Sequence, residues 1–551
     1  MGSKPLGGRR THSVVIALCA AIVPAAAGAQ NATADRIDAI ERQIRNLQIE
    51  LQQLKNDLGE AKQQLRQSRG EAQRSKEEAR QAREAAEQAR QNAARAATAE
   101  SQATQAAAQA QAAAVPPPPP PGSGIKVDFP GGRPTISTSD GSISFAIGTQ
   151  IQFDMGGYFQ NPTATTQFPH LNDGVNLRRG RIFFNAKYGD FYAIITPDFG
   201  GSPDGSPTLY EANLNWTGFK PVTATVGYFK PYFSLYDSQS SNNFLLMERP
   251  SIVEIARNVA AGDARATLGA KAANDDISLP TGWTGSYFAS AYLTGAPFGA
   301  NSANNLTSEQ LGFVGRLAGR PYYDQDFNLH LEFSGENVFH PSINANGTPG
   351  VNVQTLIFQD RPEDRAADQN RLISTGNLSA SSANVYGGGL GASWRNFLIQ
   401  GEYYAINMNQ AKNPPAHQPS LAFNGGYVEG GWVITGEPIR YSVGDAAFAR
   451  PKVDQPWTLD GPGIGAWELG LRYSVMNLNS NVIPGVSQTV TGGIYGGLQK
   501  IVGVNLSWYP NDWIRFYLQF QYTQVDKLNS AGTVQIGQNF ETLAGRVQIA
   551  F

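Results

Sequence analysis

The sequence predicts an all-β transmembrane barrel of about 16 antiparallel strands, preceded by an α-helical coiled coil. Two observations carry this prediction. Apolar and polar residues alternate in long runs such as 209–217 and 513–525, which exceed the typical globular strand of about 5–6 residues and match the ~9–11 residues of a tilted membrane-crossing strand. Charged residues make up 16% of the 551 residues, against about 25% in an ordinary soluble protein.

The first element is a secretory signal peptide over residues 1–29. Arg9 and Arg10 precede the apolar stretch Val14–Ala27, and Ala27-Gly28-Ala29 supplies small residues for cleavage after Ala29. A membrane anchor is the alternative, but the apolar stretch is short for a membrane-spanning helix. The single cysteine lies inside this segment, so we expect the mature chain to have no disulfide and no thiol chemistry.

The second element is a periplasmic coiled coil over residues 30–100, followed by a low-complexity Ala/Pro linker over 101–124. Apolar residues recur with 3-4 spacing at Ile37, Ile40, Ile44, Leu47, Leu51, Leu54, Leu58, Ala61 and Leu65. A single solvated helix is the alternative interpretation. Isoleucine at both seam positions favours three or more strands over two.

The third element is the barrel domain, residues 125–551, in which the hydrophobic period changes from 3.5 to 2. Ile514, Phe516 and Leu518 alternate with Arg515 and Gln519. A soluble β-sandwich would show the same alternation with its apolar face inward. Strand length, the export signal and aromatic residues near strand ends favour the barrel, because aromatic girdles mark the membrane interfaces of such proteins.

The connections between the strands differ in length. Short connections at 218–221 and 509–512 are typical of periplasmic turns, and the long ones around 234–263, 337–383 and 436–463 predict outer or inward-folded loops. The final strand alternates and ends at Phe551, which resembles the assembly signal of outer-membrane barrels. We therefore expect a bacterial outer-membrane location, with the coiled coil in the periplasm.

Several short motifs occur in a specific order: Leu177-Arg178-Arg179-Gly180-Arg181, Asp198-Phe199-Gly200-Gly201, Val226-Gly227-Tyr228-Phe229-Lys230 and Met247-Glu248-Arg249. With them, residues 125–551 resemble the phosphate-selective porins O and P. The resemblance implies a sixteen-stranded trimeric porin, a third loop folded inward, and basic pore residues that select anions. Its constriction loop would be 234–263, with Arg249 and Arg257. Tyr232 stands where the family commonly has an acidic residue nearby.

If the apolar face meets lipid, the opposite face lines the pore. Its basic members, the candidates for guiding anions, are Arg179, Arg181, Lys187, Arg265, Lys271, Arg316, Arg472, Arg515 and Arg546. Its acidic members are Asp154, Asp198, Glu211, Glu332, Glu402, Glu429 and Glu468. Charged rings select ions through their local field. The arginines either guide anions or pair with facing carboxylates and brace the wall.

The expected function is a water-filled diffusion channel that mildly prefers phosphate or other small anions. The alternative is a non-selective or other-solute channel that also tethers the envelope through its coiled coil. Expected partners are outer-membrane lipid, two further copies in a homotrimer, small anionic solutes, and peptidoglycan or another envelope component at the coiled coil. No motif indicates an enzyme, a cofactor, a metal site or nucleic-acid binding. His330 and Glu332 alternate on one strand, where we favour wall residues over a metal pair.

Overall fold

The computed structural model describes residues 124–160, 170–201, 207–298, 310–340, 343–345, 352–366, 370–410 and 419–551. The predicted signal peptide, the coiled coil and all of the linker but Gly124 lie outside these residues. No helix in the described part is both long and apolar enough to span a membrane.

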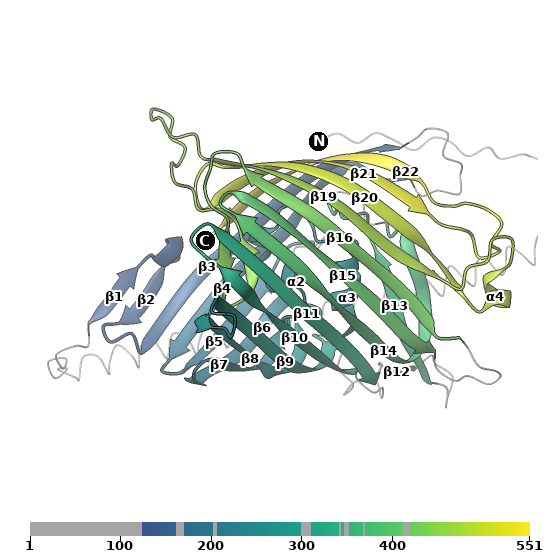
Figure 1. Cartoon of the computed structure of the whole chain (residues 1–551), viewed down its shortest axis with the longest axis horizontal. Coiled ribbons are helices and arrows are strands. Elements are labelled where there is room, and N and C mark those ends of the chain that lie inside the picture. Colours follow the sequence, from purple (N-terminus) through teal and green to yellow (C-terminus); the bar gives the residue numbers. More distant parts are fainter. Residues whose placement is uncertain are drawn as a thin grey trace, which may run out of the picture. The chain divides into compact units, whose positions relative to one another are not determined.

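Among the described residues, sixteen antiparallel strands form a closed ring, as the sequence predicts. Each strand pairs with its neighbour along the wall, and β22 closes the ring on β3. Figure 1 shows the strands tilted across the wall. The ring strands are β3 (Ile143–Gln160), β4 (Gly174–Tyr188), β5 (Phe191–Asp198), β6 (Thr208–Phe219), β7 (Val222–Phe229), β8 (Arg265–Ser278), β9 (Thr284–Pro297), β10 (Leu311–Tyr323), β11 (Phe327–His340), β14 (Ile373–Trp394), β15 (Phe397–Gln410), β16 (Leu421–Val433), β19 (Ala466–Ser480), β20 (Ile494–Tyr509), β21 (Ile514–Asp526) and β22 (Asn539–Ala550).

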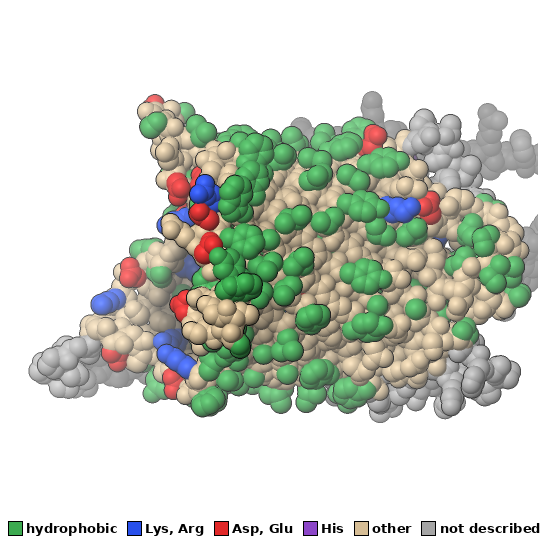
Figure 2. All heavy atoms as spheres, in the orientation of Figure 1, with side chains coloured by type: hydrophobic (Ala, Val, Ile, Leu, Met, Phe, Trp, Pro, Cys, Tyr) green, Lys and Arg blue, Asp and Glu red, His purple; other side chains and the backbone are tan. Residues whose placement is uncertain are grey.

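The alternation of residues along each strand separates an outer apolar face from an inner polar face. On β21, Phe516 and Leu518 are exposed, whereas Arg515 and Gln519 are buried in the lumen. Figure 2 shows apolar side chains spread over the outer wall. A soluble sandwich would bury that apolar face, so the exposed face identifies the barrel rather than the sandwich.

The lumen holds a packed interior of its own. The β7–β8 loop, residues 230–264, contains α2 (Leu235–Ser238), a 3-10 turn (Ser241–Asn243) and α3 (Ser251–Ala260), and both helices lie within the ring in Figure 1. Ile252, Ile255 and Val259 of α3 pack in one apolar cluster with wall residues of several strands. The loop thus occupies the space that an open channel would leave to water.

The connections at one end of the barrel are short turns, with one exception. Residues 434–465, between β16 and β19, form a long segment that starts at this end and contains the hairpin β17 (Arg440–Ser442) and β18 (Ala447–Ala449). We call it the β16–β19 segment. The sequence predicts an outer or inward-folded loop here, and the structure shows that the hairpin folds inward from the short-turn end while later residues such as Leu459 remain exposed.

The remaining elements extend the wall. The hairpin β1 (Ile125–Asp128) and β2 (Thr135–Thr138), with a 3-10 turn (Pro130–Gly132) between them, continues the sheet along β3 beyond the chain terminus. At the opposite end are β12 (Ile343–Ala345), β13 (Asn352–Asp360) and α4 (Gln488–Thr491). After β13, residues 361–366 fold back toward α3 and contribute charged side chains to the lumen.

Candidate functional site

The β7–β8 loop divides the lumen because it is anchored to walls on different sides of the ring. The backbone N–H of Leu235 donates to Glu332 on β11 at 3.0 Å and to Glu402 on β15 at 2.9 Å. Farther along the loop, the N–H of Met247 donates to Gln519 on β21 at 2.8 Å. This geometry is the inward-folded third loop that the resemblance implies.

The two arginines predicted for the constriction loop lie within it and point to one carboxylate. Arg249 Nε is 3.1 Å and Arg257 Nε 2.7 Å from Asp237 Oδ1, and Arg257 also contacts Asp263 at 2.5 Å. The Asp237 side chain is fully buried. These ion pairs stabilise the fold of the loop, and a direct role of both arginines in solute passage stays a prediction.

One glutamate of the loop, Glu248, joins it to three other parts of the chain. Arg178 donates to both carboxylate oxygens at 2.8 and 2.9 Å, a bidentate geometry. Arg546 lies at 2.7 Å, Arg179 at 3.5 Å and Arg365 at 4.0 Å. Arg546 and Arg365 have further carboxylate partners, Asp154 at 2.6 Å and Glu254 at 3.0 Å, whereas Arg178 and Arg179 share Glu248. The side chains of Arg178 and Arg365 remain 16% and 19% exposed.

Arg178 reaches this junction through a β-bulge. Gln152 of β3 pairs with Arg179 and the adjacent Phe153 pairs with Leu177, so Arg178 is an extra residue without a partner in the ladder. The bulge turns both Arg178 and Arg179 into the lumen. If the residues of β4 alternated strictly, Arg178 would lie on the lipid face, and the sequence analysis therefore did not select it. The one signal in the sequence was a charged residue on a face that is otherwise apolar.

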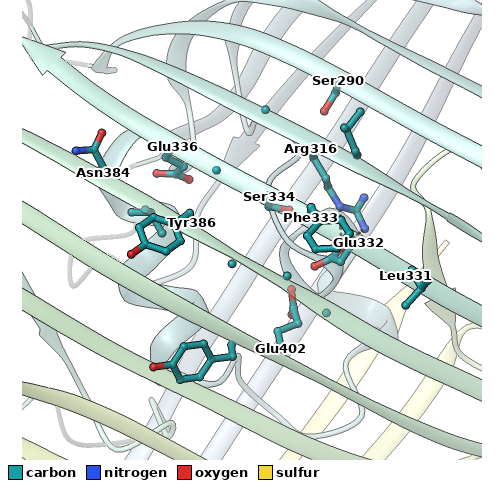
Figure 3. A pocket seen from close by; sticks show the side chains of 18 of the residues that line it. Ser290, Arg316, Leu331, Glu332, Phe333, Ser334, Glu336, Asn384, Tyr386 and Glu402 are labelled. Atoms are coloured by element: carbon teal, nitrogen blue, oxygen red, sulfur yellow. Dashed lines mark hydrogen bonds and ion pairs between the residues drawn. The ribbon is translucent and has the colours of Figure 1, made fainter.

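Most of the predicted pore-lining arginines are buried and paired. Their side chains are at most 1% exposed, and Figure 3 shows Arg316 beside its partner Glu332. The pairs are Arg316 with Glu332 at 2.6 Å, Arg472 with Glu363 at 3.0 Å, Arg515 with Glu468 at 2.9 Å, and Arg546 with Asp154 at 2.6 Å. Arg265 donates instead to backbone carbonyls of 258, 261 and 295. This geometry favours bracing of the wall for these five.

The water-accessible charges lie along β4 to β8 and the facing part of the β7–β8 loop. Lys187 is exposed and the side chain of Lys271 is 20% exposed, whereas Arg181 is buried and paired with Asp198 at 2.7 Å. Lys230 and Asp263 of the loop face the same side, with 16% and 39% of their side chains exposed. Two of the predicted residues, Lys187 and Lys271, therefore contact water on this side of the lumen, together with Lys230, which the sequence analysis did not select.

A cavity of about 1430 Å³ lies against β10, β11, β14 and β15 (Figure 3). Its rim includes Leu331 and Phe333, which are exposed on the outer face, and the run Gly387–Gly389 leaves the wall thin there. The lining is mainly apolar. The cavity is thus a recess of the membrane-facing surface and not the polar passage inside the barrel.

His330 on β11 is a wall residue. His330 is fully buried, its Nδ1 lies 2.8 Å from the hydroxyl of Tyr441, and its Nε2 lies 3.6 Å from Glu332. In the described part of the chain, no group of three or more His, Cys, Asp or Glu side chains could hold a metal ion.

The C-terminal residue closes the seam between the last and first strands of the ring. The N–H of Phe551 donates to the carbonyl of Thr149 at 3.1 Å, and the N–H of Thr149 donates to the carbonyl of Phe551 at 3.0 Å. The ring of Phe551 lies 6.2 Å from that of Trp513. Its role as an assembly signal stays a prediction.

The ion pairs of the β7–β8 loop shift the acidity of its carboxylates. Burial alone would raise the pKa of Glu254, but Arg365, Arg257 and Arg249 outweigh it and lower this pKa to about 2. Burial would also raise the pKa of Glu248, but the neighbouring arginines outweigh it and hold this pKa well below its usual range. A carboxyl with a lowered folded pKa stabilises the fold above its unfolded pKa and loses that contribution as the pH falls.

Acidification should therefore loosen the β7–β8 loop. Between pH 4.5, the ordinary pKa of a glutamate, and pH 2, Glu254 takes up a proton and its ion pairs weaken. We expect the single-channel conductance in a planar bilayer to rise and fluctuate over this interval and to be steady from pH 5 to 7. A conductance unchanged down to pH 2 would contradict a loop held by these pairs.

Comparison with known proteins identifies the family. The model of the phosphate-selective porin O and P family matches residues 145–551. Porin O of Pseudomonas aeruginosa is 24% identical over 443 residues, which cover 78% of this chain and 93% of that protein. An uncharacterized protein of Caulobacter vibrioides is 25% identical over 407 residues, covering 71% of this chain and 72% of the relative.

Among solved structures, an anion-selective porin from Comamonas acidovorans matches with a TM-score of 0.43 and 10% identity, over 74% of this chain and 100% of that one. The family match spans nearly all of the ring and contains each motif on which the resemblance rests. The chain therefore belongs to the phosphate-selective porin O and P family and is an outer-membrane porin, a channel protein rather than an enzyme, as the sequence predicts.

Proposed function

We propose that this porin is a diffusion channel for small hydrophilic solutes with a mild preference for anions. The observation that carries the proposal is the junction at Glu248, where Arg178 and Arg179 share one carboxylate and where Arg178 and Arg365 keep part of their side chains in contact with water. Guanidinium groups bind phosphate and carboxylate groups through paired hydrogen bonds. A passing anion meets donors there that the protein only partly neutralises.

The remaining predicted residues divide into two roles in this proposal. Lys187 and Lys271 contact water and attract anions directly, whereas Arg181 is paired with Asp198 at 2.7 Å and acts through its electric field. The buried arginines hold the wall and the β7–β8 loop in place and act on solutes only through their electric field; they are Arg179, Arg265, Arg316, Arg472, Arg515 and Arg546. Paired charges contribute a weak net field, so the expected preference is mild and not a strict phosphate specificity.

The test is the reversal potential of the channel in a planar bilayer under a potassium chloride gradient. If the channel prefers anions, its reversal potential lies toward the equilibrium potential of chloride. Phosphate should also reduce the chloride current if it binds at the junction. A potential set by potassium would contradict the anion preference, and the absence of stepwise conductance would contradict the channel itself.

A matched pair of variants tests the junction. Arg178→Gln should lower the chloride-to-potassium permeability ratio, because it removes one of the two partly exposed guanidinium groups. Arg395→Gln removes the same charge outside the lumen, where Arg395 pairs with Asp326 and its side chain is 61% exposed. The control should leave the ratio unchanged, and equal ratios in both variants would contradict a role of the junction in selectivity.

We also propose that the chain assembles as a homotrimer through the barrel, with the segment 30–100 as a coiled coil that reaches peptidoglycan or another envelope component. The support is the Ile/Leu seam of that segment and the resemblance described above. Deleting residues 30–124 should leave trimers and conductance intact while abolishing binding to isolated peptidoglycan. Loss of trimers in the deletion variant would show that the segment is the assembly element.

A further inference from the structure

The hairpin of the β16–β19 segment brings an acidic residue into the lumen from the short-turn end, against the β7–β8 loop. Its hairpin turns at Val443–Ala446, between β17 and β18. Arg316 of the wall fixes the turn, since its guanidinium donates to the carbonyls of Asp445 and Ala446 at 2.7 Å each. Phe448 packs where Gly391 of β14 has no side chain, and a β-carbon at that glycine would lie 2.5 Å from the ring.

The carboxylate of Asp445 meets the β7–β8 loop and the wall at one point. Tyr232 of the loop donates its hydroxyl to Asp445 Oδ1 at 3.0 Å, and Ser442 donates to the other oxygen at 2.8 Å. Lys271 of β8 donates to the Tyr232 hydroxyl at 2.6 Å and to the carbonyl of Gly444 at 2.8 Å. Its ammonium nitrogen is 3.9 Å from Asp445.

This junction differs from the braced pairs because water reaches it. The side chain of Asp445 is 39% exposed and that of Lys271 is 20% exposed, whereas both members of the Arg316–Glu332 pair are fully buried. Burial, reinforced by Asp445, raises the pKa of Tyr232, so the phenol keeps its proton and remains a donor to the carboxylate. A permeating ion on this side of the lumen therefore passes a carboxylate and an ammonium held at a fixed separation.

We propose that Asp445 is a specificity-determining residue of the channel, a negative charge placed beside Lys271 that limits the preference for anions. The inference rests on the proposed diffusion-channel function and adds the residue that sets its charge balance. Lys271 attracts anions to this part of the passage, and Asp445 offsets that attraction. Tyr232 and Ser442 are positioning residues, because they hold the carboxylate and do not themselves carry charge.

The test is the Asp445→Asn variant of the full-length porin, measured as a reversal potential in a gradient around 0.1 M potassium chloride. The amide keeps an acceptor for Tyr232 while it removes the charge. We expect the chloride-to-potassium permeability ratio to rise about threefold over the wild type. Asp460→Asn is the matched control, because Asp460 lies on the same segment and is exposed; its ratio should equal that of the wild type.

Salt concentration separates a charge effect from a change in pore size. At 1 M salt the Debye length falls to about 3 Å, so an electrostatic shift should shrink strongly while a steric change in conductance would persist. Lys271→Gln should move the ratio in the opposite direction, toward potassium, and this second variant carries the test if Asp445→Asn does not fold. Heat-modifiable migration on gels checks folding of each variant.

The outcomes distinguish this inference from the proposed function. A wild-type channel without anion preference, together with a rise in the ratio for Asp445→Asn, would overturn the proposed preference and support the role of Asp445. An anion-preferring wild type whose ratio is unchanged in Asp445→Asn, as in the Asp460→Asn control, would overturn the inference alone. A shift of equal size in both variants would also overturn it, since the effect would not depend on the lumen.

Discussion

Replacing Arg546 with methionine should destabilise the barrel by about 3–5 kcal/mol, because the substitution leaves a buried carboxylate without its cation. Arg546 on β22 and Asp154 on β3 are register partners across the seam that closes the ring, with contacts of 2.6 and 2.7 Å and no exposed side-chain surface. The loss should appear as a lower urea midpoint for unfolding in lipid vesicles, followed by the gel mobility of unheated samples.

The surface pair between Arg395 and Asp326 provides the control for this prediction. Its contact distance is 3.1 Å, but the side chains are 61% and 48% exposed, so Arg395→Met should cost about 1 kcal/mol or less. The double variant Asp154→Leu with Arg546→Met should recover part of the lost stability, because no buried carboxylate then remains unpaired at the seam. A double variant less stable than Arg546→Met would contradict this account of the seam.

Replacing Glu248 with glutamine should change selectivity and loop order together. The carboxylate neutralises part of the charge of Arg178, Arg179, Arg365 and Arg546, and the amide cannot. We expect the chloride-to-potassium permeability ratio to rise about fourfold, since a unit charge about 5 Å from a permeating ion is worth about 0.8 kcal/mol in water. Reversal potentials measure the ratio.

The same substitution should also raise the noise of the open channel, because the bidentate contact with Arg178 anchors the β7–β8 loop to β4. Glu541→Gln serves as the control: it removes an equal charge from β22 at an exposed position. We expect no change in ratio or noise for the control. An unaltered ratio in Glu248→Gln would show that the arginine junction lies apart from the path of the ions.

Much of the ring could be predicted because each strand carries its own signal. A strand in a barrel wall needs apolar side chains toward lipid on every second residue, and this requirement is local, so the alternation on β21 or β22 is visible without knowledge of the neighbours. The terminal Phe551 and the short turns follow from the same local rules. The sixteen strands and the inward-pointing arginines were therefore accessible from the pattern.

The composition of the candidate site was less accessible, because it depends on segments that have no period. The bulge at Arg178 comes from an offset between β3 and β4, which neither strand shows alone. Arg365 and Asp445 lie in connections whose residues give no sign of the wall they will meet. Whether a predicted arginine such as Arg316 faces water or a carboxylate likewise depends on how the loops fold over it.

The sequence by itself determined that this chain builds a membrane barrel and directs a row of arginines inward, because periodicity and composition act residue by residue along the chain. Only the tertiary structure decided which of those charges remain available to a solute. Burial and ion pairing are properties of contacts between distant segments. Glu248 of the β7–β8 loop pairs with Arg546, while the β16–β19 segment accepts hydrogen bonds from Arg316 and places Asp445 beside Lys271. Selectivity follows from the charges left uncompensated, and that balance exists only after the loops have folded into the lumen.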